Sequence, residues 1–269
     1  MRSFVNWGKC GPWIALAVLG AAALVLVAAR VRERRRFEGA VGSAEAHLLA
    51  RFERQAVAVR TLAAWPIATA AEFAAAVAAL PDRGPPALGF ARSFRRGETG
   101  EIENALQQQG FAGLRVWPDS GREGRTAVVW LLPLRRGAIG YDMLADPVRR
   151  DALERARDSG APALSGRTTL EEAGPGFLLC APVYRGGSMP ATLEGRRAQL
   201  LGWTFRAVRE DDFFKALLGP EPVEMNLDDG DDAPPRSGRA AFRPGRLEEK
   251  RRIVLGGRAW TIRFSPPLP

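Results

Sequence analysis

The sequence predicts an α+β protein in which an N-terminal transmembrane helix and a long second helix precede a domain of short strands and helices. Three observations support this fold class. An uncharged run lies close to the N-terminus, and a stripe of apolar residues spaced three and four apart follows it. Beyond the stripe, several apolar runs of strand length alternate with short helical segments, which is typical of α+β domains.

The uncharged run extends from Cys10 to Ala29. As a helix it would span about 30 Å, the hydrocarbon thickness of a bilayer. We expect residues 1–9 to be cytoplasmic and residues 10–29 to form an uncleaved, single-pass anchor. A cleaved signal peptide is the alternative, because small residues precede Arg30 as they do at a cleavage site.

Residues 30–64 are predicted to form a long amphipathic stalk helix that ends before Pro66, since a residue preceding proline disfavours helix. Its stripe would serve equally as a dimer seam or as a face packed on the chain's own domain. The residues of the stripe are Phe37, Val41, Ala44, Leu48, Phe52, Gln55, Val59 and Leu62.

The remaining elements follow from short local patterns. A helix between an Asp146 cap with Pro147 in its first turn and a terminal Gly160 is predicted from capping preferences. Gly256-Gly257 indicates a hairpin turn, with Trp260, Ile262 and Phe264 on one face. We also predict helices over Ala71–Leu80 and Gly100–Gly110, and strands over Ala87–Ala91, Ala127–Leu134, Phe177–Tyr184 and Leu200–Val208.

A polar segment, "LDDGDDAPPRSGR", begins at Leu227 and is the best boundary between two modules. It would divide a domain of residues 65–226 from a small C-terminal hairpin module of residues 227–269. The acidic cluster within it (Asp228, Asp229, Asp231 and Asp232) lacks the alternation and the glutamate of a calcium loop, so a solvated turn is the better interpretation.

Composition argues against several function classes. The formal charge is +9, but the arginines are spread along the chain, whereas a nucleic-acid reader concentrates its charge on one helix or arm. His47 is the only histidine, so neither a catalytic triad nor a zinc site can be built from it. No phosphate-binding glycine loop occurs. Cys10 and Cys180 are not expected to pair. We therefore expect no enzyme activity, no metal, no cofactor and no nucleic-acid partner.

Three stretches together resemble the CHASE domain, a family of extracytoplasmic sensory domains of histidine kinases and cyclases that includes plant cytokinin receptors. They are "GYDMLADPVRRDALERARDSGAPALSG" from Gly140, "GFLLCAPVYRGG" from Gly176 and "TLEGRRAQLLGWTFRAVREDDFF" from Thr192. Weaker similarity extends over Phe37–Phe264. The resemblance implies a stalk helix, a membrane-distal PAS-like sensor domain and a small membrane-proximal PAS-like remnant.

The resemblance also implies a topology and a site. Five arginines within Arg30–Arg36 would favour a cytoplasmic domain by charge counting, but family members place it outside the cytoplasm. We therefore expect an inner-membrane protein with a periplasmic sensor. Trp130, Leu132, Leu153 and Ser165 are implied to line its ligand pocket. Pro133 stands where cytokinin receptors carry a ligand-binding aspartate, which favours a different and less polar ligand.

The predicted function is that of a membrane-anchored sensor that binds a small molecule for signal transduction. No output module follows the domain in this sequence, so we expect a separate signalling partner, with a homodimer through the stalk as a further option. The alternative is a membrane-tethered structural or interaction protein, or a receptor fragment, whose pocket is filled by side chains. A hydrolase using Ser165 would need a base that the sequence does not show.

Overall fold

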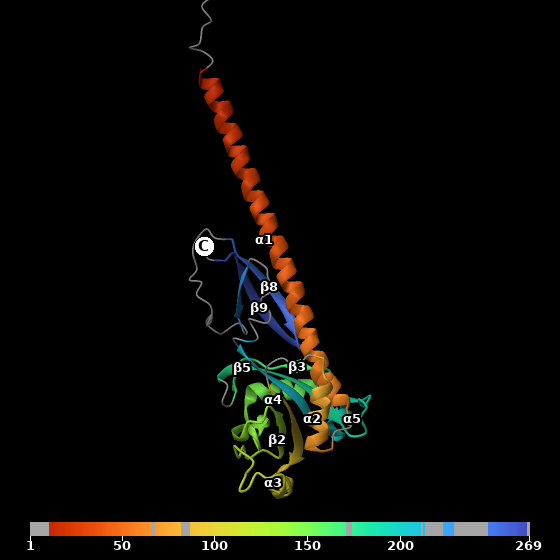
Figure 1. Ribbon diagram of the computed structural model, residues 1–269. Helices are drawn as coiled ribbons and strands as arrows, with labels where there is room; N and C mark the ends of the chain where they lie inside the picture. Colours follow the sequence, from red (N-terminus) through yellow and green to blue (C-terminus); the bar gives the residue numbers. More distant parts are fainter. Residues whose placement is uncertain are drawn as a thin grey trace, which may run out of the picture.

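The computed structural model describes residues 11–65, 68–81, 87–170, 174–210, 212, 223–228 and 247–267; the side chains of residues 11–15 and 226–228 are not among those described. One long helix, α1 (Gly11–Ala64), runs beside two antiparallel sheets (Figure 1). The larger sheet lies at the C-terminal end of α1, and the smaller sheet lies further back along it. The α+β class with a long N-terminal helix is confirmed.

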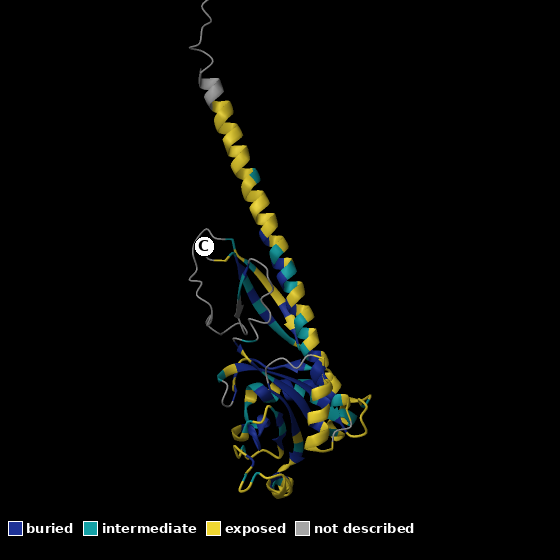
Figure 2. Cartoon of the chain, viewed as in Figure 1, coloured by how far each residue is buried: buried dark blue, intermediate teal, exposed yellow. Residues whose placement is uncertain are grey.

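The apolar stripe of α1 packs against the chain's own sheets. The predicted stripe residues are buried, apart from Phe52 and Gln55, which are half-buried. Figure 2 shows the buried face of α1 only where the helix meets the two sheets. The helix ends at Ala64, before Pro66, as predicted. Because the chain itself covers this stripe, a homodimer through the stalk would need another face of α1, and it stays a prediction.

The predicted membrane span begins outside the described residues, since Cys10 and the side chains of residues 11–15 are not described. From Leu16 to Val27, the large apolar side chains of α1 are 59–71% exposed. In the part of the chain that the structure describes, no helix has both the length and the apolarity needed to cross a bilayer.

The larger sheet has six strands in the order β2-β1-β6-β5-β3, and β4 also pairs with β5. All its pairings are antiparallel, and the first strand of the chain lies inside the sheet between β2 and β6. The strands are β1 (Leu88–Arg95), β2 (Gly124–Leu132), β3 (Ala163–Leu164), β4 (Thr168–Leu170), β5 (Gly174–Tyr184) and β6 (Leu200–Arg209).

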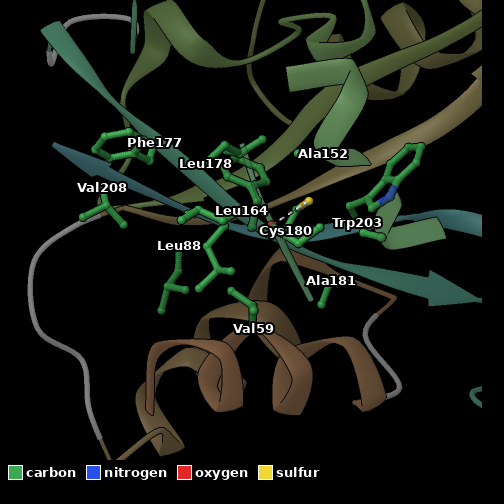
Figure 3. Close-up of a cluster of buried hydrophobic side chains, with 14 of the residues drawn as sticks. Val59, Leu88, Ala152, Leu164, Phe177, Leu178, Cys180, Ala181, Trp203 and Val208 are labelled. Carbon is green, nitrogen blue, oxygen red and sulfur yellow. Dashed lines mark hydrogen bonds between the residues drawn. The ribbon is translucent and has the colours of Figure 1, made fainter. Parts of the chain in front are cut away.

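Helices cover both faces of this sheet, and neighbouring residues of β6 bond to opposite sides. The Thr204 hydroxyl donates to the Val59 carbonyl of α1 at 2.7 Å. The Trp203 indole N–H donates to the Leu153 carbonyl at 2.9 Å, on the face covered by α4 (Pro147–Ser159). Figure 3 shows the layers, with Val59 below the sheet and Ala152 above it. The face of the sheet that α1 covers also carries α2 (Ala70–Ala79), which contacts both α1 and β2.

The capping residues in the sequence predicted the bounds of α4 correctly. The Asp146 carboxylate accepts hydrogen bonds from the backbone N–H groups of Val148 and Arg149, Pro147 is the first helical residue, and Gly160 ends the helix with φ 74°. The other helices are α3 (Thr99–Gln108) and α5 (Leu193–Ala198), with short 3-10 turns η1 (Arg96–Glu98), η2 (Arg136–Ala138) and η3 (Met143–Ala145). The sequence analysis missed β4 and α5, because elements of three and six residues carry too short a pattern.

The smaller sheet has the order β7-β9-β8, formed by β7 (Glu224–Asp228), β8 (Glu249–Leu255) and β9 (Arg258–Ser265). The hairpin turn lies at Gly256-Gly257, both with positive φ, as predicted. Trp260, Ile262 and Phe264 are all buried, as the alternation indicated. β7 straddles the expected module boundary at 226/227, so we propose to place that boundary before Glu224. Residues 229–246, which include the rest of the acidic segment, lie outside the described residues.

The two sheets meet through the hairpin turn. The Gly256 carbonyl accepts hydrogen bonds from the Leu164 N–H at 3.1 Å and from the Arg155 guanidinium at 2.7 Å, and that guanidinium also donates to the Leu164 carbonyl. The Phe177 and Trp260 rings pack edge to face at 5.5 Å. The small module is therefore joined to α4 and the larger sheet by a continuous core.

Candidate ligand-binding site

A cavity of about 220 Å³ lies on the α4 side of the larger sheet. Its walls come from β2, β5 and β6 and from the segment that runs through η2 and η3 into α4. Pockets of this kind, with apolar walls and a few polar groups, are the usual form of a small-molecule site. The lining residues are Ala87, Val128, Leu131, Arg135, Ala138, Tyr141, Met143, Arg149, Leu170, Leu178, Phe205, Ala207, Arg209 and Asp212.

A β-bulge shapes the sheet side of this cavity. Phe90 pairs with Trp130 and Ala91 with Val128, which leaves Val129 without a partner in the register. One extra residue shifts the alternation of side chains between the two faces. As a result Val128 and Leu131, three positions apart, both line the cavity.

The buried Asp142 carboxylate holds the opposite wall in place. It accepts hydrogen bonds from the Thr126 N–H and hydroxyl, both at 2.9 Å, and from the Leu144 N–H at 3.1 Å. Its second oxygen accepts from Ser120 at 3.2 Å and from the Arg125 guanidinium at 3.2 Å. These bonds attach the turn around η3 to β2, and so they position its neighbours Tyr141 and Met143 at the cavity.

Arg149 is the most enclosed of the charged groups that line the cavity, with 3% of its surface exposed. Its guanidinium lies 4.5 Å from the centre of the Tyr141 ring, its Nε lies 3.4 Å from the Asp146 carboxylate, and one Nη donates to the Thr169 carbonyl. Asp146 is in turn held by the Thr168 hydroxyl at 2.6 Å. The N-terminus of α4 therefore orients this arginine.

The sequence analysis missed Arg149. On α4, Val148 is only half-buried, and the buried residues are Arg149, Ala152, Leu153 and Ala156. These positions are spaced as i, i+3, i+4 and i+7, so the available signal was a single arginine within an otherwise apolar stripe.

The structure does not bring the four predicted pocket residues together. Leu153 is fully buried under Trp203. The Ser165 hydroxyl, also fully buried, donates to the Gly166 carbonyl at 2.7 Å and accepts from the Leu178 N–H at 2.8 Å. Neither residue lines the cavity, because the core is packed where they lie.

Trp130 and Leu132 line a different hollow of about 340 Å³, beside α2 at the edge strand β2. The Trp130 ring stacks on Phe73 at 5.7 Å and on Phe90 at 5.2 Å. Among the described residues its buried indole N–H has no hydrogen-bond partner. The bulge at Val129 is the physical reason for this placement, since it puts Trp130 on the face opposite Val128, with which it would share a face in a regular strand. The four residues thus lie in separate environments in this structure, two of them in the packed core and two at the hollow beside α2.

The other candidate groups are consistent with structural roles. The Cys180 thiol is fully buried, and desolvation raises its pKa to about 12. Cys10 lies outside the described residues. Among the residues described, no group of histidine, cysteine, aspartate and glutamate side chains is arranged to hold a metal ion.

Comparisons with known proteins agree with this architecture. No curated protein matches the sequence. A solved structure described as an extracellular ligand binding receptor from Desulfohalobium retbaense DSM5692 aligns with a TM-score of 0.50 and 14% identity, over 86% of this chain and 39% of that one. This chain thus spans about two fifths of that receptor's length, and at this identity the likeness concerns the fold alone.

A second structure is the ligand binding domain of the Pseudomonas aeruginosa PAO1 amino acid chemoreceptor PctC in complex with GABA. It aligns with a TM-score of 0.46 and 12% identity, over 85% of this chain and 95% of that one. The family model described as "CHASE domain" matches residues 68–237, which is more than half of the sequence. The chain therefore belongs to the CHASE domain family.

Proposed function

We propose that this chain is a membrane-anchored, extracytoplasmic sensor that binds a small molecule in the cavity between the larger sheet and α4. The observation that carries the proposal is the cavity itself, whose lining combines apolar side chains of the sheet with several charged groups. In this reading the larger sheet is the PAS-like sensor domain of the family, and β7, β8 and β9 are its membrane-proximal PAS-like remnant.

The anchor is proposed from the N-terminal part of α1. Its large apolar side chains from Leu16 to Val27 are exposed, and the basic run Arg30–Arg36 follows them. Apolar side chains on an otherwise unpacked helix are favourable in a bilayer. Family membership supports an extracytoplasmic domain, with the protein in the inner membrane. An alkaline phosphatase fused after residue 269 should then be active, and an inactive fusion would contradict this topology.

β6 offers a physical route from the cavity to the stalk. Phe205 and Ala207 line the cavity on one face of the strand. Thr204 and Arg206 alternate with them and bond to α1, through the Val59 carbonyl and the Gln55 side-chain oxygen. A ligand that favours one position of β6 would therefore shift the balance of α1 conformations.

The rival proposal is a tethered structural protein with a filled pocket. The tight packing around Leu153 and Ser165 fits it at that position. The cavity beside Phe205 favours the sensor, because a purely structural core is normally packed without such a void.

Ligand stabilisation of the full chain in nanodiscs tests the sensor. Intrinsic tryptophan fluorescence would follow thermal unfolding in the presence of a library of small metabolites. A compound at 100 times its Kd should add about 2.7 kcal/mol of stability. Ala207→Phe should abolish this stabilisation by filling the cavity. Ala259→Phe, a matched change at a half-buried strand residue of the small sheet, should leave it intact. Equal loss in both variants would contradict the proposed site.

A further inference from the structure

Positively charged side chains outnumber negatively charged ones among the described residues that line the cavity. Among the residues that the structure describes, arginines line it at three positions, Arg135, Arg149 and Arg209, and a carboxylate lines it at one, Asp212. Arginine keeps its positive charge at all physiological pH values. The Asp146 carboxylate largely offsets Arg149, at 3.4 Å from its Nε. Among the described residues that line the cavity, guanidinium groups therefore outnumber carboxylates.

The polar and charged lining residues differ in how far they are exposed to solvent. Arg149 and Tyr141 are buried, Arg135 and Asp212 are half-buried, and Arg209 is exposed. Solvent therefore reaches the rim of the cavity more easily than its interior. Attraction between charges strengthens where water is excluded, so an anion drawn in at the rim gains most when it lies close to the enclosed guanidinium.

The rest of the lining is apolar. Val128, Leu178 and Phe205 are all at most 4% exposed and belong to three different strands of the sheet. They would contact a hydrocarbon or aromatic group, while the planar guanidinium groups match the geometry of a carboxylate. A volume of about 220 Å³ limits the ligand to a small molecule.

We propose that the ligand of this cavity is a small organic acid, whose carboxylate is bound by Arg135 and Arg209 near Arg149 and whose apolar part lies on the sheet. This inference rests on the proposed sensor function and adds the chemical class of the ligand. It also replaces the less polar ligand expected from Pro133, since that residue is exposed and lies outside the cavity lining.

The test uses matched triplets of compounds on the same carbon skeletons, from butyrate, butylamine and butanol to phenylacetate, phenethylamine and phenylethanol. Thermal unfolding of the full chain in nanodiscs is measured with each compound. Stabilisation confined to the acids, and weaker at high salt, is the expected result. Stabilisation by amines or alcohols as strong as that by acids would overturn the acid class and leave the sensor standing. No stabilisation by any compound would count against the acid class and the sensor site together.

Substitutions then test which arginines bind the carboxylate of the acid. Arg135→Gln and Arg209→Gln should each weaken acid binding about tenfold or more, since the loss of a charge-assisted hydrogen bond corresponds to roughly that factor. Arg252→Gln removes the same charge from an exposed position on β8 and should leave the affinity unchanged. Arg149→Lys keeps the enclosed charge but loses the guanidinium fork, and it is compared only if its unfolding remains cooperative. Equal affinities in Arg135→Gln, Arg209→Gln and Arg252→Gln would overturn the assignment.

Discussion

Asp142→Ala should destabilise the domain by removing the acceptor that joins the cavity wall to the sheet. The carboxylate is fully buried and accepts five hydrogen bonds from Ser120, Arg125, Thr126 and Leu144. The substitution leaves these donors without that partner in a region closed to water. A buried donor that loses its acceptor retains its full desolvation penalty.

The magnitude depends mainly on Arg125, whose side chain is 4% exposed. Removal of one member of a buried ion pair typically costs about 3–5 kcal/mol. Arg125 would keep a hydrogen bond to the Pro118 carbonyl at 3.0 Å and a 3.6 Å contact to the exposed Asp119 carboxylate. These remaining contacts place the expected loss at the lower end of that range, about 3 kcal/mol.

Urea unfolding followed by tryptophan fluorescence measures this loss. Asp119→Ala is the matched control, since it removes the exposed partner of the same Arg125 and should leave the midpoint almost unchanged. Asp142→Asn keeps the shape of the side chain and should fall between the two. A loss of less than about 1 kcal/mol for Asp142→Ala, the range of an exposed ion pair, would refute the role given to Asp142.

Three further experiments test the contact between the two sheets at the hairpin turn, the ion pairs of Asp158 and the buried core around Cys180. Gly256→Ala should destabilise the fold, because a Cβ there would lie 2.3 Å from a backbone nitrogen of β3 and φ is 54°; urea midpoints measure it. Hydrogen bonds, above all from Arg197, lower the pKa of Asp158, so its contribution is full above the unfolded pKa of about 4 and is lost as the pH falls below it. Asp158→Asn should therefore make the free energy of unfolding fall less steeply as the pH is lowered through the acid range. In a Cys10→Ala background, Cys180 should resist thiol reagents at pH 8 until the protein unfolds, as labelling rates would show.

Each of these expectations has an outcome that contradicts it. Gly257→Ala is the control for Gly256→Ala, since its Cβ would meet only the flexible end of the Arg155 side chain at 3.2 Å. Equal urea midpoints for the two variants would show that the close approach of Gly256 to β3 does not affect stability. An acid limb identical with and without Asp158 would argue against its ion pairs. Labelling of Cys180 faster than global unfolding would show that local opening reaches this core.

Several elements could be predicted from the sequence because their causes are local. The capped helix after Asp146, the end of α1 before Pro66 and the Gly256-Gly257 turn depend on the backbone preferences of a few residues. The alternation around Trp260 and the stripe of α1 follow from the geometry of a strand and of a helix. Family membership could also be predicted, because its motifs are contiguous in sequence.

Only the tertiary structure decided which surfaces these elements share. The unpaired Val129 depends on how β2 aligns with β1, and one extra residue there moved Trp130 to the face opposite the cavity. The cavity arginines come from three separate segments, with Arg135 after β2, Arg149 on α4 and Arg209 on β6, and only the packing of these segments places them around one cavity. The sequence by itself determined the elements, their caps and the family, since these follow from neighbouring residues. The position and charge of the candidate site were decided by the fold, because strand register and helix packing arise from contacts between distant parts of the chain.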